Sequence, residues 1–123
     1  MIIGIGTDIA EVQRIVKSIE NKSFLEKVFS KVEIAYCESK VNKAESYAAR
    51  FAAKEAFFKA LGTGWRGGMA FKEVEVMNDE LGKPTLNIIG ETAVIIKDKN
   101  IKSIHVSLSH VKDFAMATVV IEG

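Results

Sequence analysis

The sequence predicts an α+β fold, in a loose sense α/β, in which the helices are segregated from a small antiparallel sheet. Three observations predict it: an alternating, isoleucine-rich segment at the N-terminus, a long alanine-rich helical stretch in the middle, and two alternating segments at the C-terminus. The 123 residues are 48% hydrophobic and 27% charged, as in a globular chain that buries its own core. No linker or internal repeat interrupts them, so we expect one domain over residues 1–123.

Charge and cysteine content exclude several classes of partner and site. A net charge of +1 provides no general attraction for nucleic acid or for an anionic membrane. A single cysteine, Cys37, forms neither an internal disulfide nor a zinc site, which favours a reducing cytoplasm. The N-terminus lacks the basic start of a signal peptide, and no stretch approaches the ~20 apolar residues of a membrane span. We therefore expect a cytoplasmic chain with no nucleic-acid or membrane partner.

The first third of the chain predicts a strand followed by helices. Residues 2–8 alternate and predict a strand, and from Ile9 the apolar residues recur with a helical period. Asp8 lies at the junction. Ser30 and Glu33 have the spacing of a capping box, which predicts a helix over 30–40.

The remaining elements are predicted from local composition and from residues that end a helix or strand. Residues 43–61 are rich in alanine and other helix formers, and Gly62 ends that helix. The other expected elements are strands over 71–77, 84–89, 103–109 and 114–121, with a helix over 91–99.

Glu55 is the first candidate for chemistry. On the long helix it lies between Phe51 and Phe58, on a stripe that is expected to face the core. A carboxylate there is costly unless it is paired or binds a metal. The alternative is a surface pair with Lys59, because a glutamate followed by a lysine four residues later stabilises a helix.

Asp8 is the second candidate. It is either the N-cap of the following helix or a carboxylate at a strand end that faces a cleft. Two carboxylates from separate elements suit Mg²⁺ when a substrate phosphate supplies further oxygens. Gly4 and Gly6 mark the close approach of a backbone or a ligand to the first strand, or a bulge.

The glycines and histidines in the second half are less specific. The glycine-rich run 62–68 lacks the ending of a P-loop, so it is either a flexible loop or a set of backbone amides near a phosphate. His105 and His110 fall on opposite faces of a strand and are not expected to share one metal. His110 is either a phosphate donor at a strand end or a polar residue at a turn.

Two motifs resemble those of the bacterial holo-[acyl-carrier-protein] synthases, the small type of 4'-phosphopantetheinyl transferase. The first is Gly-Ile-Gly-Thr-Asp-Ile at residues 4–9, continuing to Arg14, and the second is Arg-Phe-Ala-Ala-Lys-Glu-Ala-Phe-Phe-Lys-Ala-Leu-Gly-Thr-Gly at 50–64. Residues 82–84 and 106–110 agree with the family as well. The resemblance spans the whole chain.

The resemblance implies the 4'-phosphopantetheinyl transferase fold and an activity in fatty acid biosynthesis. The 4'-phosphopantetheine arm of coenzyme A is transferred to a serine of apo acyl carrier protein, and adenosine 3',5'-bisphosphate is released. It also implies that Asp8 and Glu55 hold Mg²⁺ against the coenzyme A pyrophosphate, with Lys59 as the third catalytic residue. The residues it places at coenzyme A are Arg50, Lys59, Gly64, Pro84, Ser109 and His110, and those it places at the carrier protein are Arg14, Lys17, Phe24 and Phe51.

The resemblance further implies a homotrimer with its sites between subunits, because the chain is similar to one half of the double-length transferases. Either Glu55 or a water molecule accepts the serine proton, and the sequence does not distinguish between them. Val111 stands where the family often has a hydroxyl residue, and Trp65 and Arg66 have no assigned role. Two alternatives are disfavoured. The presence of Asp8 and Glu55 argues against a non-catalytic nucleotide-binding domain, and the short length of the chain argues against a transferase for polyketide or peptide carriers.

Overall fold

The computed structural model describes residues 1–123 and contains two antiparallel sheets and five α-helices. Its strands are β1 (Ile2–Glu11), β2 (Val74–Asn78), β3 (Pro84–Ile88), β4 (Ser103–His110) and β5 (Phe114–Glu122). Its helices are α1 (Val12–Ser18), α2 (Lys22–Val28), α3 (Lys31–Glu38), α4 (Lys43–Ala60) and α5 (Gly90–Ile95), with single 3₁₀ turns η1 (Phe71–Glu73) and η2 (Lys97–Lys99). The α+β prediction is confirmed.

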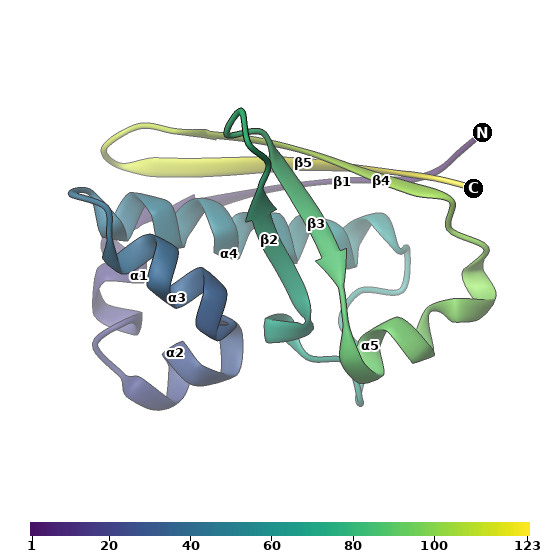
Figure 1. Ribbon diagram of the computed structural model, residues 1–123, viewed down its shortest axis with the longest axis horizontal. Helices are drawn as coiled ribbons and strands as arrows, with labels where there is room; N and C mark the ends of the chain where they lie inside the picture. The colour runs from purple at the N-terminus through teal and green to yellow at the C-terminus, as the bar shows by residue number, and fades with distance from the viewer.

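The main sheet has the strand order β1-β5-β4, and α4 runs along its inner face (Figure 1). The second sheet is the β2–β3 hairpin, which lies in front of α4 in that view. Helices α1, α2 and α3 gather at one end of the molecule and α5 lies toward the other. No helix has the length and hydrophobicity needed to cross a bilayer.

The close packing of α4 on β1 depends on glycine. A Cβ atom at Gly4 would collide with the carbonyl of Ala60, and one at Gly6 with the carbonyl of Ala56. Of the alternatives that the sequence left open for these glycines, the structure therefore supports the close approach of another backbone. This approach brings the next inward-facing residue of the strand, Asp8, next to α4.

The first strand is longer than expected, which corrects the role of Asp8 as a cap. Ile9 pairs with Met116 of β5 and Glu11 with Phe114, so the backbone from Ile9 to Glu11 continues the sheet although its apolar spacing also suits a helix. Helix α1 begins only at Val12. Asp8 is therefore a strand residue, and the N-cap prediction for it is wrong.

The other differences are local. The capping box of Ser30 and Glu33 is confirmed, but α2, which begins after the N-cap Asn21, was not predicted as a separate helix. Residues 71–73 form a 3₁₀ turn before β2, and the helix expected over 91–99 is split into α5 and η2. Each of these segments is short, and a single turn of helix leaves little periodicity in a sequence.

Helix α4 is buried on almost every side. Between Tyr47 and Ala60, the residues that are not buried are Phe51, Glu55 and Lys59, which follow one another at intervals of four. The prediction that Glu55 faces the core is thus wrong, since it lies on the one open stripe of the helix. The fully buried charge of α4 is its neighbour Lys54.

Candidate active site

The open stripe of α4 meets the inner face of β1 at Asp8. The Lys59 Nζ atom donates a hydrogen bond to Asp8 Oδ1 at 2.8 Å and another to the Thr7 carbonyl at 3.1 Å. The Asp8 side chain is 17% exposed and that of Lys59 is 54% exposed. The hydrogen bond from Lys59 to Asp8 raises the pKa of the lysine. The ion pair therefore links an edge strand to the central helix at a point that solvent reaches.

Glu55 lies beside this pair. Burial raises the pKa of its carboxyl group, and the negative charge of Asp8 raises it further, while Lys59 acts in the opposite direction. The lysine pairs with Asp8, and no ion pair within 4.0 Å joins it to Glu55, so the helix pair considered from the sequence does not form. The two carboxylates are thus close enough for their charges to interact, and Glu55 has no charged partner within 4.0 Å.

The donor set fits Mg²⁺. Magnesium prefers oxygen ligands and is commonly bound by one or two carboxylates together with substrate phosphates and water. No group of three or more histidine, cysteine, aspartate or glutamate side chains gathers anywhere in the chain, so the protein itself provides no closed metal cage. Asp8 and Glu55 are suited to a cation that brings phosphate oxygens with it, and their mutual repulsion favours a positive charge between them.

A second group of expected residues lines a cavity on the other side of α4. Arg50, Pro84 and His110 all border this cavity of about 200 Å³. Arg50 Nη2 donates to Asn78 Oδ1 at 2.7 Å, and the guanidinium carbon lies 4.0 Å from the centre of the Tyr36 ring. Its Nε atom is buried without a hydrogen-bond partner. A buried guanidinium with an unused donor is suited to bind an anion.

Three of the expected coenzyme A residues lie outside that cavity, and one of them is Lys59, which pairs with Asp8. Ser109 is on the outer face of β4 and is exposed, and Gly64 is in the loop after α4 with a φ of 67°. The Nδ1 atom of His110 is 2.9 Å from Glu45 Oε1. No local pattern in the sequence pointed to Tyr36 or Asn78, which line the cavity only through the packing of α3 and β2, or to Glu45, which contacts His110 from α4.

The residues expected at the carrier protein form a third group. Arg14 and Phe51 line a cavity of about 250 Å³ between β1, α1 and α4. The Phe24 ring lies 6.1 Å from that of Phe51, centre to centre, and Lys17 is exposed at the end of α1. Because Phe51 is one turn before Glu55 on α4, this surface adjoins the carboxylates.

Comparison with known proteins identifies the family. The family model of the 4'-phosphopantetheinyl transferase superfamily matches residues 4–119. The chain belongs to this superfamily. The resemblance inferred from the two motifs is confirmed.

Transferases of this superfamily match the chain over its full length. A holo-[acyl-carrier-protein] synthase of Solibacter usitatus is 48% identical over 125 residues, covering 100% of both chains. The crystal structure of the synthase from Neisseria meningitidis is 34% identical with a TM-score of 0.91, again over 100% of both chains. A synthase from Bacillus anthracis, solved in complex with CoA (3',5'-ADP), is 38% identical with a TM-score of 0.83 and covers 100% of this chain and 98% of its own.

Proposed function

We propose that residues 1–123 form one domain with holo-[acyl-carrier-protein] synthase activity. It transfers the 4'-phosphopantetheine arm of coenzyme A to a serine of apo acyl carrier protein and releases adenosine 3',5'-bisphosphate. The observation that carries this proposal is the meeting of Asp8, Glu55 and Lys59 in a chain whose full-length relatives bear that name. The carrier of fatty acid synthesis, in the cytoplasm, is the proposed partner.

The three residues have separate roles in this proposal. Asp8 and Glu55 would hold Mg²⁺, and the bound ion would supply positive charge to the pyrophosphate of coenzyme A. Lys59, freed in part from Asp8, offsets the charge that grows on the departing nucleotide phosphate. The attacking hydroxyl belongs to the carrier protein, so this chain needs no nucleophile of its own. Phosphoryl transfer then depends mainly on positioning and on charge stabilisation.

The Arg50 cavity is the proposed site for the nucleotide end of coenzyme A. It offers the guanidinium of Arg50 and the imidazole of His110 to phosphate, with Pro84 as an apolar wall. The proposal extends this binding surface to Ser109 and Gly64, which lie at the end of β4 and after α4.

Within one chain the Asp8–Glu55–Lys59 site and the Arg50 cavity lie on opposite sides of α4. Arg50 and Lys59 are nine residues apart on α4, so at roughly 100° per residue they point in opposite directions. Asp8 is on edge strand β1 and His110 on the other edge strand, β4, with β5 between them. A ligand that uses both sites therefore fits best where the β4 side of one subunit meets the β1 side of another, as a homotrimer permits.

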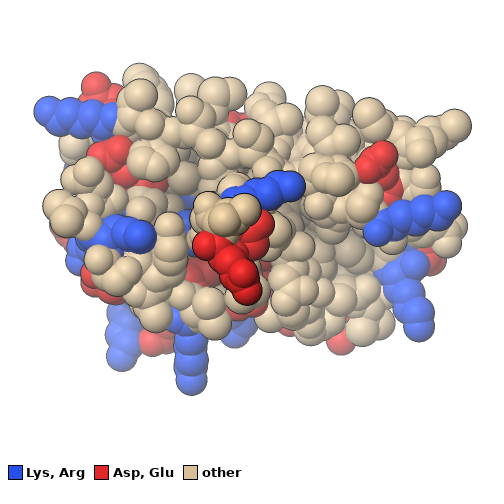
Figure 2. Space-filling view, turned by 45° about the horizontal axis from the view of Figure 1, so that its top comes forward, with Lys and Arg blue, Asp and Glu red and all other residues tan.

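The outer face of the main sheet supports self-association. Ile3, Ile5 and Ile9 of β1, with Phe114 and Met116 of β5, are between 44% and 67% exposed. In Figure 2 the upper part, where the sheet comes forward, is largely uncharged. A contiguous exposed apolar surface is typical of an interface. Light scattering is expected to give three times the 13.5 kDa chain mass, and I5K is expected to lower it, whereas a monomeric wild type would contradict the homotrimer.

The carrier protein is expected to dock on the third group of residues. Arg14 and Lys17 provide positive charge, and Phe24 and Phe51 provide an adjoining apolar surface. A basic rim of this kind attracts an acidic partner. Its position next to Glu55 would bring the carrier serine to the carboxylates.

The direct test mixes the protein with coenzyme A, Mg²⁺ and apo acyl carrier protein. Mass spectrometry is expected to show the carrier gaining the mass of one 4'-phosphopantetheine arm, and D8A and E55A are expected to abolish that gain. A chelator should abolish it as well. An unchanged carrier mass with the wild-type protein would overturn the proposed function, and normal transfer by either variant at low Mg²⁺ would overturn the metal assignment.

A further inference from the structure

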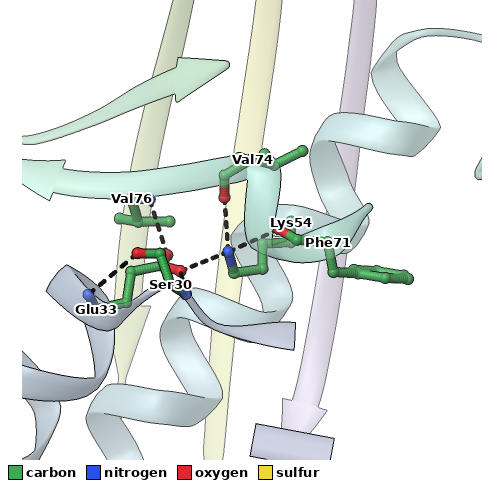
Figure 3. Close-up of polar contacts among 6 residues, drawn as sticks. All are labelled: Ser30, Glu33, Lys54, Phe71, Val74 and Val76. Atoms are coloured by element: carbon green, nitrogen blue, oxygen red, sulfur yellow. Dashed lines mark hydrogen bonds and ion pairs between the residues drawn. The ribbon is translucent and has the colours of Figure 1, made fainter. Parts of the chain in front are cut away.

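A fully buried ion pair lies one residue from Glu55. Lys54 Nζ and Glu33 Oε1 are 2.7 Å apart, and both side chains are 0% exposed. Figure 3 shows the pair at the meeting point of α3, α4 and the start of β2. Charged side chains are rarely buried to this extent, and neither of these two has a part in the proposed chemistry.

Every polar atom of the pair has a directed partner. Besides Glu33, the Lys54 ammonium donates to the carbonyls of Phe71, at 2.9 Å, and Val74, at 2.7 Å. Glu33 accepts from the backbone N–H of Ser30 at 2.9 Å and from that of Val76 at 2.8 Å. These bonds connect α4 to three other segments at one point. Hydrogen bonds have narrow limits on distance and angle, so they fix the helix more closely than apolar contacts do.

The opposite side of α4 packs on the main sheet without directed bonds at these positions. There, small side chains such as Ala56 and Ala60 pack on Gly4 and Gly6 of β1. Small side chains allow close approach, but they do not impose the distance and angle that a hydrogen bond requires. A rotation or a shift of α4 along the sheet would move Glu55 and Lys59 relative to Asp8.

We propose that Lys54 and Glu33 are positioning residues that fix the rotation and the axial position of α4, and so set how Glu55 and Lys59 face Asp8. This inference rests on the proposed function for its chemistry. Groups that hold a metal or offset charge must be kept within about 0.5 Å of their working geometry by the residues behind them. Lys54 lies on the same helix as both groups, directly beside Glu55.

The stability of a variant that lacks the ion pair can distinguish a positioning role of Lys54 and Glu33 from a purely stabilising one. A buried ion pair contributes little net stability, and replacing it with apolar residues of similar volume is often neutral or stabilising. The double variant E33L/K54M keeps the volume and removes the directed bonds. Because the same change takes a partner from the Val76 N–H and from the Val74 carbonyl, we expect it to fold with a melting temperature moderately below that of the wild type. A purely structural role predicts that it then works normally.

The test measures metal binding as well as catalysis. Mn²⁺ is titrated into each protein with saturating coenzyme A, and free Mn²⁺ is followed by electron paramagnetic resonance. For E33L/K54M we expect affinity and kcat to fall about 10-fold to 100-fold, as when residues behind a metal ligand are changed, with the KM for apo carrier unchanged. The matched control is E38Q/K43M, which removes an exposed pair between α3 and α4 that lies 3.2 Å apart. It should leave both quantities at wild-type values.

Each outcome decides the matter. Wild-type Mn²⁺ affinity and kcat in a stable E33L/K54M would overturn the inference. If that variant fails to fold, E33Q replaces it: Gln keeps the volume, but it has one acceptor oxygen where Glu33 uses two, and its N–H₂ group then faces a donor. A loss of Mn²⁺ affinity in folded E33Q supports positioning, and an unchanged affinity overturns it. If the wild type transfers no arm, the proposed function fails, while Mn²⁺ binding still tests the positioning role.

Discussion

Two lysine–carboxylate pairs on α4 have almost the same length and opposite surroundings. Lys54 and Glu33 are 2.7 Å apart with both side chains fully buried, whereas Lys59 and Asp8 are 2.8 Å apart with the lysine half exposed. Burial lowers the pKa of Lys54, while the bond to Asp8 raises the pKa of Lys59. An ion-pair distance therefore does not distinguish a structural pair from a functional one.

The two pairs differ in how many of their charged groups are still available to bind a ligand. Each proton of the Lys54 ammonium has an acceptor, so this pair cannot take another ligand without losing a bond. Lys59 shares its ammonium between Asp8 and one carbonyl, and Glu55 next to them has no charged partner. The second group can exchange partners when a phosphate and a cation arrive, which is what a binding site for charged ligands requires.

The largest effect on stability is expected from K54M alone. This change leaves the Glu33 carboxylate buried without its cation, and breaking a buried pair in this way costs about 3–5 kcal/mol of the free energy of unfolding. K59M, the matched change in the exposed pair, should cost no more than about 1 kcal/mol. Urea unfolding at matched protein concentration measures both. Equal losses in the two variants would remove the distinction between the pairs.

The next effect is on activity. E55Q keeps the shape of the side chain but removes a proposed metal ligand, so transfer should slow by about 100-fold or more. Stability should not fall. The carboxyl pKa is raised in the folded protein, so the ionised group costs stability at pH values above its unfolded pKa of about 4.3.

The pH dependence of protein stability tests whether ionised Glu55 destabilises the folded protein. As the pH rises from the unfolded pKa through the raised folded pKa of Glu55, the wild type should lose stability relative to E55Q, and the difference should then stay constant. Thermal unfolding of both proteins without metal across that range measures it. A wild type that gains stability relative to E55Q over the same range would show that a hidden partner stabilises the ionised Glu55.

A smaller effect is expected at the docking surface. R14E reverses the charge of an exposed side chain on α1, and it should raise the KM for the acidic carrier about 10-fold while leaving the KM for coenzyme A unchanged. K22E, on the exposed face of α2, is the control for charge alone. Steady-state transfer assays separate the two constants. Equal increases for both substrates would argue against a docking role for Arg14.

The sequence predicted the parts of the fold that depend on local chemistry. The capping box at Ser30, the long alanine-rich helix and the C-terminal strand pair all appear with nearly the expected bounds. The helix expected from Ile9 failed because pairing with β5 outweighs a local apolar period. The juxtaposition of Asp8 and Glu55 followed from motif resemblance and not from spacing.

Other features depend on contacts between distant segments and left no local sign. Lys54 sits in an alanine-rich helical run, where a lysine usually indicates an exposed position, and only its contact with Glu33 and β2 shows that it is buried. Asn78 and Tyr36 reach Arg50 in the same way. Side chains brought together by tertiary packing can be placed only once that packing is known.

The smallest expected effect is the coupling between Asp8 and Lys59. A double-mutant cycle of D8A and K59A should give about 1 kcal/mol or less at low salt, because the pair is partly exposed and the loss of Asp8 also relieves the repulsion on Glu55. Raising the salt to about 1 M shortens the Debye length to about 3 Å and should weaken the coupling further. A coupling that persists in salt would mean that ions do not reach the pair, and it would contradict the exposure of Lys59 on which this expectation rests.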